Sequence, residues 1–220
     1  METVYMIPGL GAQSSIFEKL MFQNCQMVHV RWIEPQKKES LSSYANRLLE
    51  QIPNNASNIV GLSFGGMLAS EMALLRPNAK VVIISSCSHA LQLPAWYRIG
   101  KWLPLKMGQS KGFEQPRLRI MQRILGIRSK DEKAFFQNMW KTTNHNWAHE
   151  FVQMILRWEL DKKPTNIFHI HGTKDRLLPH PNSGVDYSIH NGTHWMIRED
   201  AAILTSIIEQ HFKNTNKHQS

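Results

Sequence analysis

A serine between glycines, at the junction of a strand and a helix, constrains the fold of this chain more than any other feature. The segment Gly61-Leu62-Ser63-Phe64-Gly65 ends the strand-like stretch Asn58–Leu62 and opens the helical pattern Phe64–Arg76. A turn this tight strains its central residue and exposes that side chain beyond the end of the strand. We therefore expect Ser63 to be a nucleophile, and the structural alternative is a plain glycine-rich turn.

Strand-like and helical segments alternate along most of the chain. Ser40 is a plausible N-cap for a helix that ends before Pro53, and Ser15 with Glu18 predicts the capping box of another short helix. The alternation predicts an α/β fold with an open, mostly parallel sheet of about six strands and helices on both faces. Catalytic groups of such sheets lie at the carboxyl ends of the strands. The expected strands are Thr3–Pro8, Met27–Trp32, Asn58–Leu62, Lys80–Ser85, Ile167–His171 and Val185–Ile189, and a closing helix is expected from about Asp200 to Phe212.

Residues 90–164 interrupt this alternation with a basic, tryptophan-rich insert. The insert carries 14 Lys and Arg against 6 Asp and Glu, and five of the seven tryptophans. Its apolar residues recur at helical spacing, and Ser129 with Glu132 forms another capping box, so we expect a helical cap. The predicted organisation is a core of residues 1–89 and 165–220 with a cap of residues 90–164. The charge indicates a solvated helix face, or a surface that attracts anionic substrates or membranes.

A serine hydroxyl needs a base to take its proton, and the base needs an acid to orient it. The predicted strand Ile167–His171 is followed by Asp175, and the next strand is followed by His194. The order Ser63, Asp175, His194 is the one expected for this architecture. Among competing histidines, His171 and His190 fall in strand-like segments and His180 lies between two prolines, so His194 is favoured. The alternative is a structural His194 in its loop.

The tetrahedral intermediate of acyl transfer also needs preorganised donors for its oxyanion. One donor is expected to be the backbone N–H of Phe64, directly after the nucleophile. The other is expected in the turn after the first strand, Pro8-Gly9-Leu10-Gly11, where we select the N–H of Leu10. The glycines there permit the unusual backbone that would aim this N–H inward.

Three other features of the sequence could indicate a metal site, a reactive thiol or nucleotide binding. His169 and His171 with Asp175 are a faint metal-ligand pattern, but Arg176 stands where a further histidine would follow, so no metal site is expected. Cys87 is expected to be buried and inert rather than a reactive thiol. No G-x-G-x-x-G pattern supports a dinucleotide, and no zinc-finger, RNA-recognition or basic-zipper pattern supports nucleic acid as a partner.

Together these motifs resemble the α/β-hydrolase superfamily, from Thr3 to the closing helix, with the insert in the position of the cap. Pro8–Gly11 resembles the family's oxyanion turn, with proline where histidine is common, and Gly61–Gly66 resembles its nucleophile elbow. His171–Asp175 and Gly192–His194 resemble its acid and histidine loops. Two departures are visible. The chain starts at what would be the family's third strand, and only 18 residues separate Asp175 from His194.

The predicted function is hydrolysis of a carboxylic ester or related acyl bond through an acyl-enzyme, with no cofactor. The substrate is expected to be a small ester or acyl compound, with an anionic group favoured by the basic cap. Thioester or carbon–carbon bond hydrolysis on the same triad stays open, as does a non-catalytic ligand-binding protein or a peripheral membrane protein. No apolar run reaches the ~18–20 residues of a membrane span, and the N-terminus does not look like a secretory signal. A cytoplasmic location is therefore expected.

Overall fold

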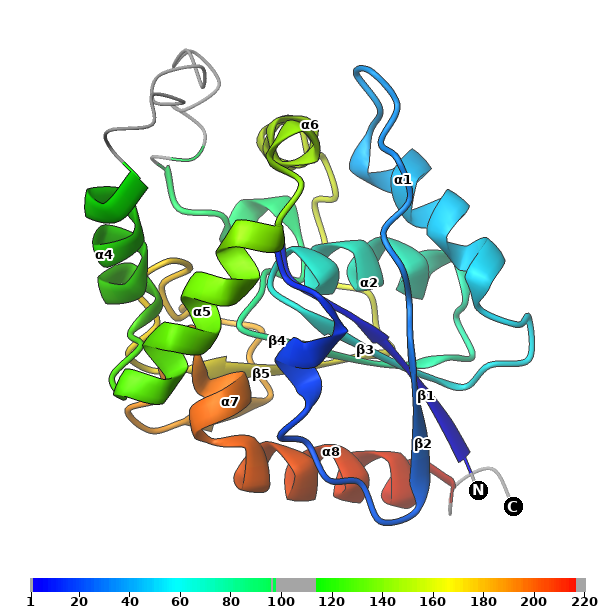
Figure 1. The fold of residues 1–220 in the computed structure, drawn as a ribbon. Helices are drawn as coiled ribbons and strands as arrows, with labels where there is room; N and C mark the ends of the chain where they lie inside the picture. Colours follow the sequence, from blue (N-terminus) through cyan, green and yellow to red (C-terminus); the bar gives the residue numbers. More distant parts are fainter. Residues whose placement is uncertain (1, 96, 98–113, 217–220) are drawn as a thin grey trace.

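A computed structural model describes residues 2–95, 97 and 114–216 of the chain. Its six strands form one sheet in the order β2-β1-β3-β4-β5-β6, and each neighbouring pair is parallel (Figure 1). This confirms the predicted open parallel sheet. The strands are β1 (Glu2–Ile7), β2 (Cys25–His29), β3 (Asn58–Leu62), β4 (Lys80–Ile84), β5 (Ile167–Gly172) and β6 (Tyr187–Ile189).

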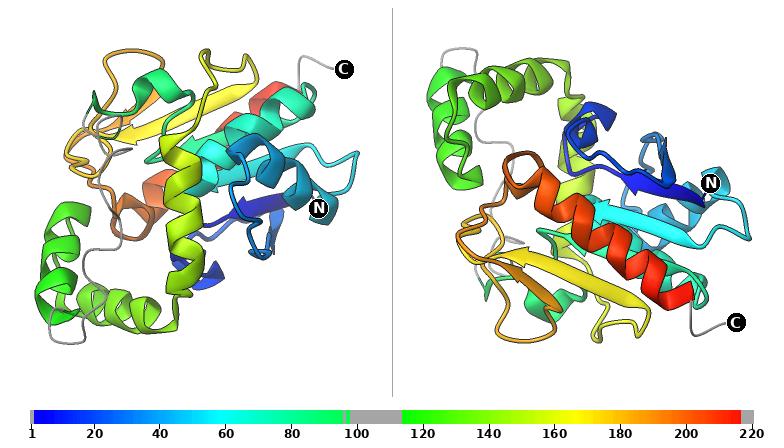
Figure 2. Two further views of the ribbon diagram at one scale, coloured as in Figure 1. Left: turned by 90° about the horizontal axis from the view of Figure 1, so that it is seen from above. Right: turned by 90° about the horizontal axis from the view of Figure 1, so that it is seen from below.

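Helices cover both faces of the sheet, as two further views show (Figure 2). Successive strand residues point to opposite faces, so Ile59 and Val81 enter one apolar cluster while Val60 and Val82 enter another. Both faces are covered, which is why β3 and β4 are buried at every position. The helices and short 3-10 segments are η1 (Ser14–Phe17), α1 (Leu41–Leu48), η2 (Leu49–Gln51), α2 (Phe64–Leu75), η3 (Ala90–Gln92), α4 (Glu114–Leu125), α5 (Lys130–Thr142), α6 (His145–Leu156), α7 (Met196–Glu199) and α8 (Ala201–Asn216).

The first predicted capping box is wrong. The 3-10 segment η1 has Gln13 at its N-cap without a side-chain hydrogen bond, and the Glu18 carboxylate instead accepts a hydrogen bond from Arg198 at 2.8 Å. A charged guanidinium is a stronger partner than a backbone N–H, so the tertiary contact prevails. The Ser40 cap is confirmed, because its hydroxyl accepts a hydrogen bond from the Ser43 N–H at 3.1 Å.

Helices α4, α5 and α6 lie toward the end of the sheet at which the strands finish (Figures 1 and 2). They belong to the predicted cap, of which Trp96 and Trp102 lie outside the described residues. Buried hydrogen bonds join residues of the predicted cap to the rest of the chain. After α6, the Trp158 indole donates to Glu71 of α2 at 2.6 Å, and Glu132 of α5 accepts from the Trp195 indole at 2.7 Å.

The sheet register brings the predicted chemical groups to one edge. Ile7 pairs with Gly61, and Leu62 pairs with Ile84, so β1, β3 and β4 end level with one another. Gly172 at the end of β5 pairs with Ile189 at the end of β6. The loops that carry the predicted oxyanion turn, nucleophile, acid and base therefore leave the sheet side by side.

Candidate active site

Ser63 occupies the strained turn between β3 and α2. Its backbone has a φ of +52° and a ψ of −118°, a region that costs a non-glycine residue about 1–3 kcal/mol. The strain is retained because the Ser63 N–H donates to the Ile84 carbonyl at 2.9 Å, and the Ser86 hydroxyl donates to the Ser63 carbonyl at 2.7 Å. The side chain of Ser63 is thereby presented at the carboxyl edge of the sheet.

Glycine is required beside this turn because the backbones of β1 and α2 approach closely. A Cβ built at Gly65 would lie 2.3 Å from the Pro8 carbonyl oxygen and 2.4 Å from that of Ile7. Neither backbone atom can move without shifting β1, so a side chain at position 65 would force the nucleophile turn and the Pro8–Gly11 turn apart.

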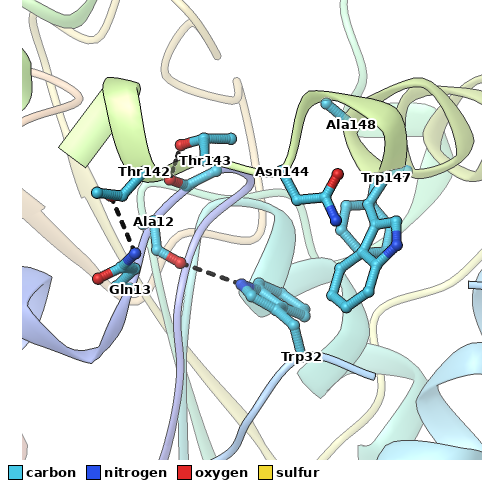
Figure 3. Close-up of a pocket in the computed structure, with 10 residues that line it drawn as sticks. Ala12, Gln13, Trp32, Thr142, Thr143, Asn144, Trp147 and Ala148 are labelled. Carbon is cyan, nitrogen blue, oxygen red and sulfur yellow. Dashed lines mark hydrogen bonds between the residues drawn. The ribbon is translucent and has the colours of Figure 1, made fainter. Parts of the chain in front are cut away.

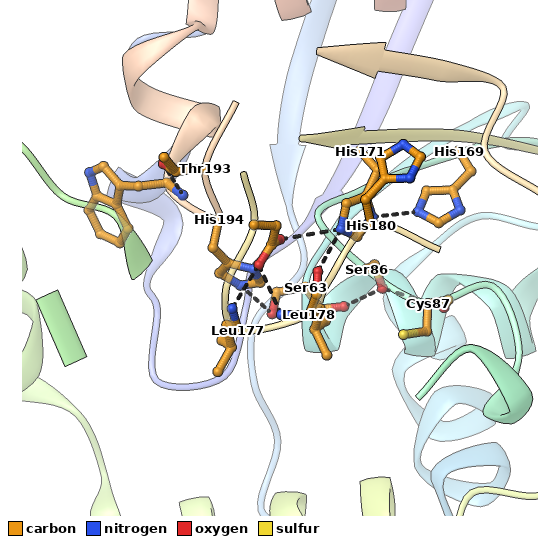
Figure 4. A network of polar contacts seen from close by, with 12 residues as sticks. Ser63, Ser86, Cys87, His169, His171, Leu177, Leu178, His180, Thr193 and His194 are labelled. Atoms are coloured by element: carbon orange, nitrogen blue, oxygen red, sulfur yellow. Dashed lines mark hydrogen bonds and ion pairs between the residues drawn. The ribbon is translucent and has the colours of Figure 1, made fainter. Parts of the chain in front are cut away.

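The structure brings Ser63, Asp175 and His194 into one hydrogen-bonded chain, in which Figure 4 labels Ser63 and His194. His194 Nε2 lies 3.0 Å from Ser63 Oγ, and His194 Nδ1 lies 2.7 Å from Asp175 Oδ2. Since the carboxylate can only accept, Nδ1 carries the proton and Nε2 is left to accept the proton of the serine hydroxyl. This is the geometry that general-base activation of a serine requires.

The Asp175 side chain is fully buried and held from several sides. Its Oδ1 accepts the backbone N–H groups of Leu177 and Leu178, both at 2.9 Å, and its Oδ2 lies 3.4 Å from His171 Nε2. Burial by itself would raise the pKa of Asp175. Electrostatic attraction to His194 and the hydrogen bonds from His171 and His194 outweigh that effect, so the pKa lies well below its ordinary value. Asp175 is therefore ionised when it faces His194.

His171 is a neighbour of Asp175 that the sequence reasoning considered only as a competing base or metal ligand. It lies in β5, with Nε2 2.8 Å from the Leu178 carbonyl and Nδ1 3.0 Å from His169 Nε2. A carbonyl only accepts, so His171 Nε2 is the protonated nitrogen. In the sequence, only its position four residues before Asp175 indicated that His171 could contact the predicted acid. Within the described residues, no group of three or more His, Cys, Asp or Glu is arranged to hold a metal ion.

The two predicted oxyanion donors lie at positions suited to that role. Phe64 is the first residue of α2, so its N–H has no partner within the helix. In the Pro8–Gly11 turn, a Cβ built at Gly9 would lie 3.3 Å from Ser63 Cβ, which places this turn directly against the nucleophile. Within the described part of the chain, the Leu10 N–H makes no hydrogen bond to another backbone group.

A pocket of about 170 Å³ lies beside this turn (Figure 3). Trp32 and Phe151 on its wall pack against Phe64 with tilted rings, at ring-centroid distances of 5.8 and 5.0 Å. The pocket is therefore one side chain away from the nucleophile turn. A cavity of about 150 Å³ can hold benzene, so the space suits one ring or a short acyl chain. The residues that line it are Gly11, Ala12, Gln13, Trp32, Thr142, Thr143, Asn144, Trp147, Ala148 and Phe151.

Two pocket residues escaped the sequence reasoning. Trp32, expected as the last residue of a strand, lies beyond β2 and its indole donates to the Ala12 carbonyl at 3.0 Å. Thr143 follows α5 and carries no motif, so no sequence signal could have found it. Cys87 is buried as expected, and burial raises the pKa of its thiol to about 12.

No protein-family model and no curated protein sequence matches this chain. Solved structures do match it over nearly its whole length. An enol-lactonase from Burkholderia xenovorans LB400 has a TM-score of 0.73 and 13% identity, over 96% of this chain and 91% of its own. A thermophilic esterase from Thermogutta terrifontis has a TM-score of 0.69 and 12% identity, over 97% and 90%.

A meta-cleavage product hydrolase from Pseudomonas fluorescens IP01 has a TM-score of 0.67 and 12% identity, over 98% of this chain and 92% of its own. At such low identity these likenesses carry the fold and no more. A shared fold does not fix function, which depends on the residues of the site.

Proposed function

We propose that this chain, which has the α/β-hydrolase fold, is a serine hydrolase that cleaves a carboxylic ester or related acyl bond through an acyl-enzyme. The observation that carries the proposal is the hydrogen-bonded chain from Ser63 through His194 to Asp175, with Ser63 on a strained turn. Ser63 is the N-cap residue of α2, yet its hydroxyl makes no capping hydrogen bond to the helix and faces His194 instead.

In the first half-reaction, His194 Nε2 takes the proton of Ser63 while Oγ attacks the substrate carbonyl carbon. Asp175 holds the imidazole in the required tautomer and stabilises the imidazolium. The N–H groups of Leu10 and Phe64 hold the oxyanion. The carbonyl then re-forms, and the imidazolium gives its proton to the departing alcohol oxygen, which leaves Ser63 acylated.

In the second half-reaction, water replaces the alcohol. His194 takes a proton from the water, whose oxygen attacks the acyl carbon. The second tetrahedral intermediate collapses, the proton returns to Ser63 Oγ and the carboxylic acid departs. Each step uses these side chains, the backbone donors, the substrate and water.

The pocket beside the oxyanion turn supports a small, uncharged, flat or short acyl group as the part of the substrate held there. Among its described lining residues there is no charged side chain, and Trp32 and Trp147 supply flat apolar surface. An anionic substrate, predicted from the basic cap, stays a prediction. Esters that differ only in one distant carboxylate, compared at low and high salt, test it, because screening would abolish a surface charge effect.

The test of the proposal is the hydrolysis of p-nitrophenyl esters, from acetate to long acyl chains and including benzoate. The variants are Ser63→Ala and, as a matched control, Ser42→Ala on the exposed face of α1. Sustained turnover that Ser63→Ala abolishes and Ser42→Ala retains is expected, with a preference for short or single-ring acyl groups. A folded protein that neither turns over these esters nor is labelled at Ser63 by a small fluorophosphonate would contradict the proposal. Labelling without turnover would favour a ligand-binding protein.

A further inference from the structure

The cap is hydrogen-bonded directly to the turn that is proposed to stabilise the oxyanion. Thr143, between α5 and α6, places its hydroxyl 2.7 Å from the carbonyl oxygen of Gly11, 132 positions earlier in the chain. Next to it, the Gln13 amide donates to the Thr142 hydroxyl at 3.0 Å (Figure 3). We propose that Thr143 is a positioning residue for the oxyanion hole, whose hydroxyl fixes the Gly11 carbonyl and thereby aims the Leu10 N–H. The inference rests on the proposed function.

The turn that Thr143 contacts has a defined type. The Ala12 N–H donates to the Gly9 carbonyl at 2.9 Å, which closes a four-residue turn from Gly9 to Ala12. Gly11, the third residue, has a φ of +73°, whereas the φ of Leu10 is not positive. This combination is a type II turn, which needs glycine at its third position. A Cβ built at Gly11 would also lie 3.2 Å from Thr143 Cγ2, so the threonine packs closely on this residue.

Two peptide planes carry the effect from Thr143 to Leu10. In a trans peptide the C=O and the following N–H point in opposite directions. The Thr143 hydroxyl therefore orients the plane that contains the Gly11 carbonyl and the Ala12 N–H. This N–H donates to the Gly9 carbonyl, which shares its plane with the Leu10 N–H. Fixing the first plane thus fixes the direction of the proposed oxyanion donor.

The single proton of the Thr143 hydroxyl has two acceptors within reach. The Gly11 carbonyl lies at 2.7 Å, and the Met139 carbonyl, one helical turn back, lies at 3.0 Å. A threonine at a helix end commonly donates to the carbonyl four residues earlier. The Thr143 and Gly11 oxygens, 2.7 Å apart, would repel each other if no proton lay between them. The Thr143 hydroxyl therefore donates to the Gly11 carbonyl, either alone or shared with the Met139 carbonyl.

A second donor holds the neighbouring peptide plane from the core side. The Trp32 indole donates to the Ala12 carbonyl at 3.0 Å. The turn is therefore held from both sides, by the cap through Thr143 and by the segment after β2 through Trp32. Because Thr143 belongs to the cap, the proposed oxyanion hole is complete when this part of the cap contacts the turn.

The experiment compares wild type with Thr143→Val and Thr143→Ser. Valine has nearly the same shape but no hydroxyl, and serine keeps the hydroxyl. With p-nitrophenyl acetate, Thr143→Val should lower kcat about tenfold to a hundredfold with KM within about twofold, since outright loss of an oxyanion donor costs about 10²–10³. Thr143→Ser should retain kcat within about threefold, because the donor is preserved. Thermal unfolding of each variant checks that both remain folded.

A second measurement is the affinity for phenylboronic acid, which forms a tetrahedral adduct on serine. Thr143→Val should weaken this inhibitor by about the same factor as kcat, because both report stabilisation of the tetrahedral state. Equal kcat in wild type and Thr143→Val overturns the inference and leaves the proposed function intact. An equal loss in Thr143→Ser also overturns it, since packing rather than the hydroxyl would then matter. A wild type without turnover or labelling at Ser63 overturns both proposals.

Discussion

One oxygen of the Asp175 carboxylate, Oδ2, serves two histidines: it lies 2.7 Å from His194 Nδ1 and 3.4 Å from His171 Nε2. His171 is fully buried, and it also contacts the Leu178 carbonyl, His169 and the ring of His180. The acid is thus supported by a buried polar network rather than by solvent.

Replacing His171 with leucine should therefore destabilise the fold. The change removes the hydrogen-bond partner of the Leu178 carbonyl and of His169 Nε2, at about 1–3 kcal/mol for each buried group. We expect a loss of about 3 kcal/mol in the free energy of unfolding, measured by urea denaturation. The exposed His190, in the loop after β6, is the control, and His190→Leu should change stability by less than about 0.5 kcal/mol. Equal stability of the two variants would contradict this account.

Asp175→Asn should lower kcat by about 10⁴ while the protein stays folded. An asparagine amide at this position can present its NH₂ to His194 Nδ1, which favours the wrong imidazole tautomer. Ester hydrolysis measures the loss of kcat, and a thermal melt shows whether the protein stays folded. Asp161→Asn, an exposed change after the cap helices, is the matched control and should leave kcat unchanged. A loss below about tenfold in Asp175→Asn would argue against the assigned base and acid.

Glu132 should make stability depend on pH in the acid range. Burial would raise its pKa, but hydrogen bonds from Arg198, Lys19 and Trp195 outweigh burial and lower the pKa from 4.5 to about 2. A carboxylate with a lowered pKa stabilises the fold above its ordinary pKa and loses that contribution as pH falls. The stabilisation is therefore present above pH 4.5 and lost between about 4.5 and 2.

The matched pair Glu132→Gln and Asp131→Asn tests this directly, because Asp131 is the exposed neighbour on the same helix. Glu132→Gln should lose about 3 kcal/mol at pH 7, as one partner of a buried ion pair is removed, and its stability should vary less from pH 5 to pH 2. Asp131→Asn should follow the wild-type curve. The free energy of unfolding at a series of pH values gives the comparison, and parallel curves for all three proteins would refute the assignment.

Cys87 should not react with iodoacetamide at pH 8 in the folded protein. Its thiol is buried, and with a pKa raised to about 12 it holds almost no thiolate. Cys25 is partly exposed and its pKa is raised chiefly by burial, so slow labelling at that position is expected. Mass spectrometry of the labelled protein distinguishes the two sites, and both should react in urea. Rapid native labelling of Cys87 would show that this segment opens.

Local patterns were sufficient for the sheet and for the residues now proposed to be catalytic. Runs such as Val81–Ile84 are apolar because both faces of a parallel sheet are buried, and this signal needs no tertiary information. The Ser63 turn could also be predicted from the sequence, since close approach of the backbones restricts positions such as 65 to glycine. Where prediction failed, at Ser15 and Glu18, a charged partner distant in sequence took the side chain that the local pattern had assigned to a cap.

Residue type and local spacing were enough to establish the parallel α/β sheet and to predict the order Ser63, Asp175, His194 and a basic cap. Three contacts appear only in the folded chain: Thr143 with Gly11, His171 with Asp175, and Trp32 with the Ala12 carbonyl. No local sequence pattern links Thr143 with Gly11 or Trp32 with Ala12, so these contacts could not be predicted from the sequence. They exist because strands that end level at one sheet edge bring distant loops together, and packing there selects the partners.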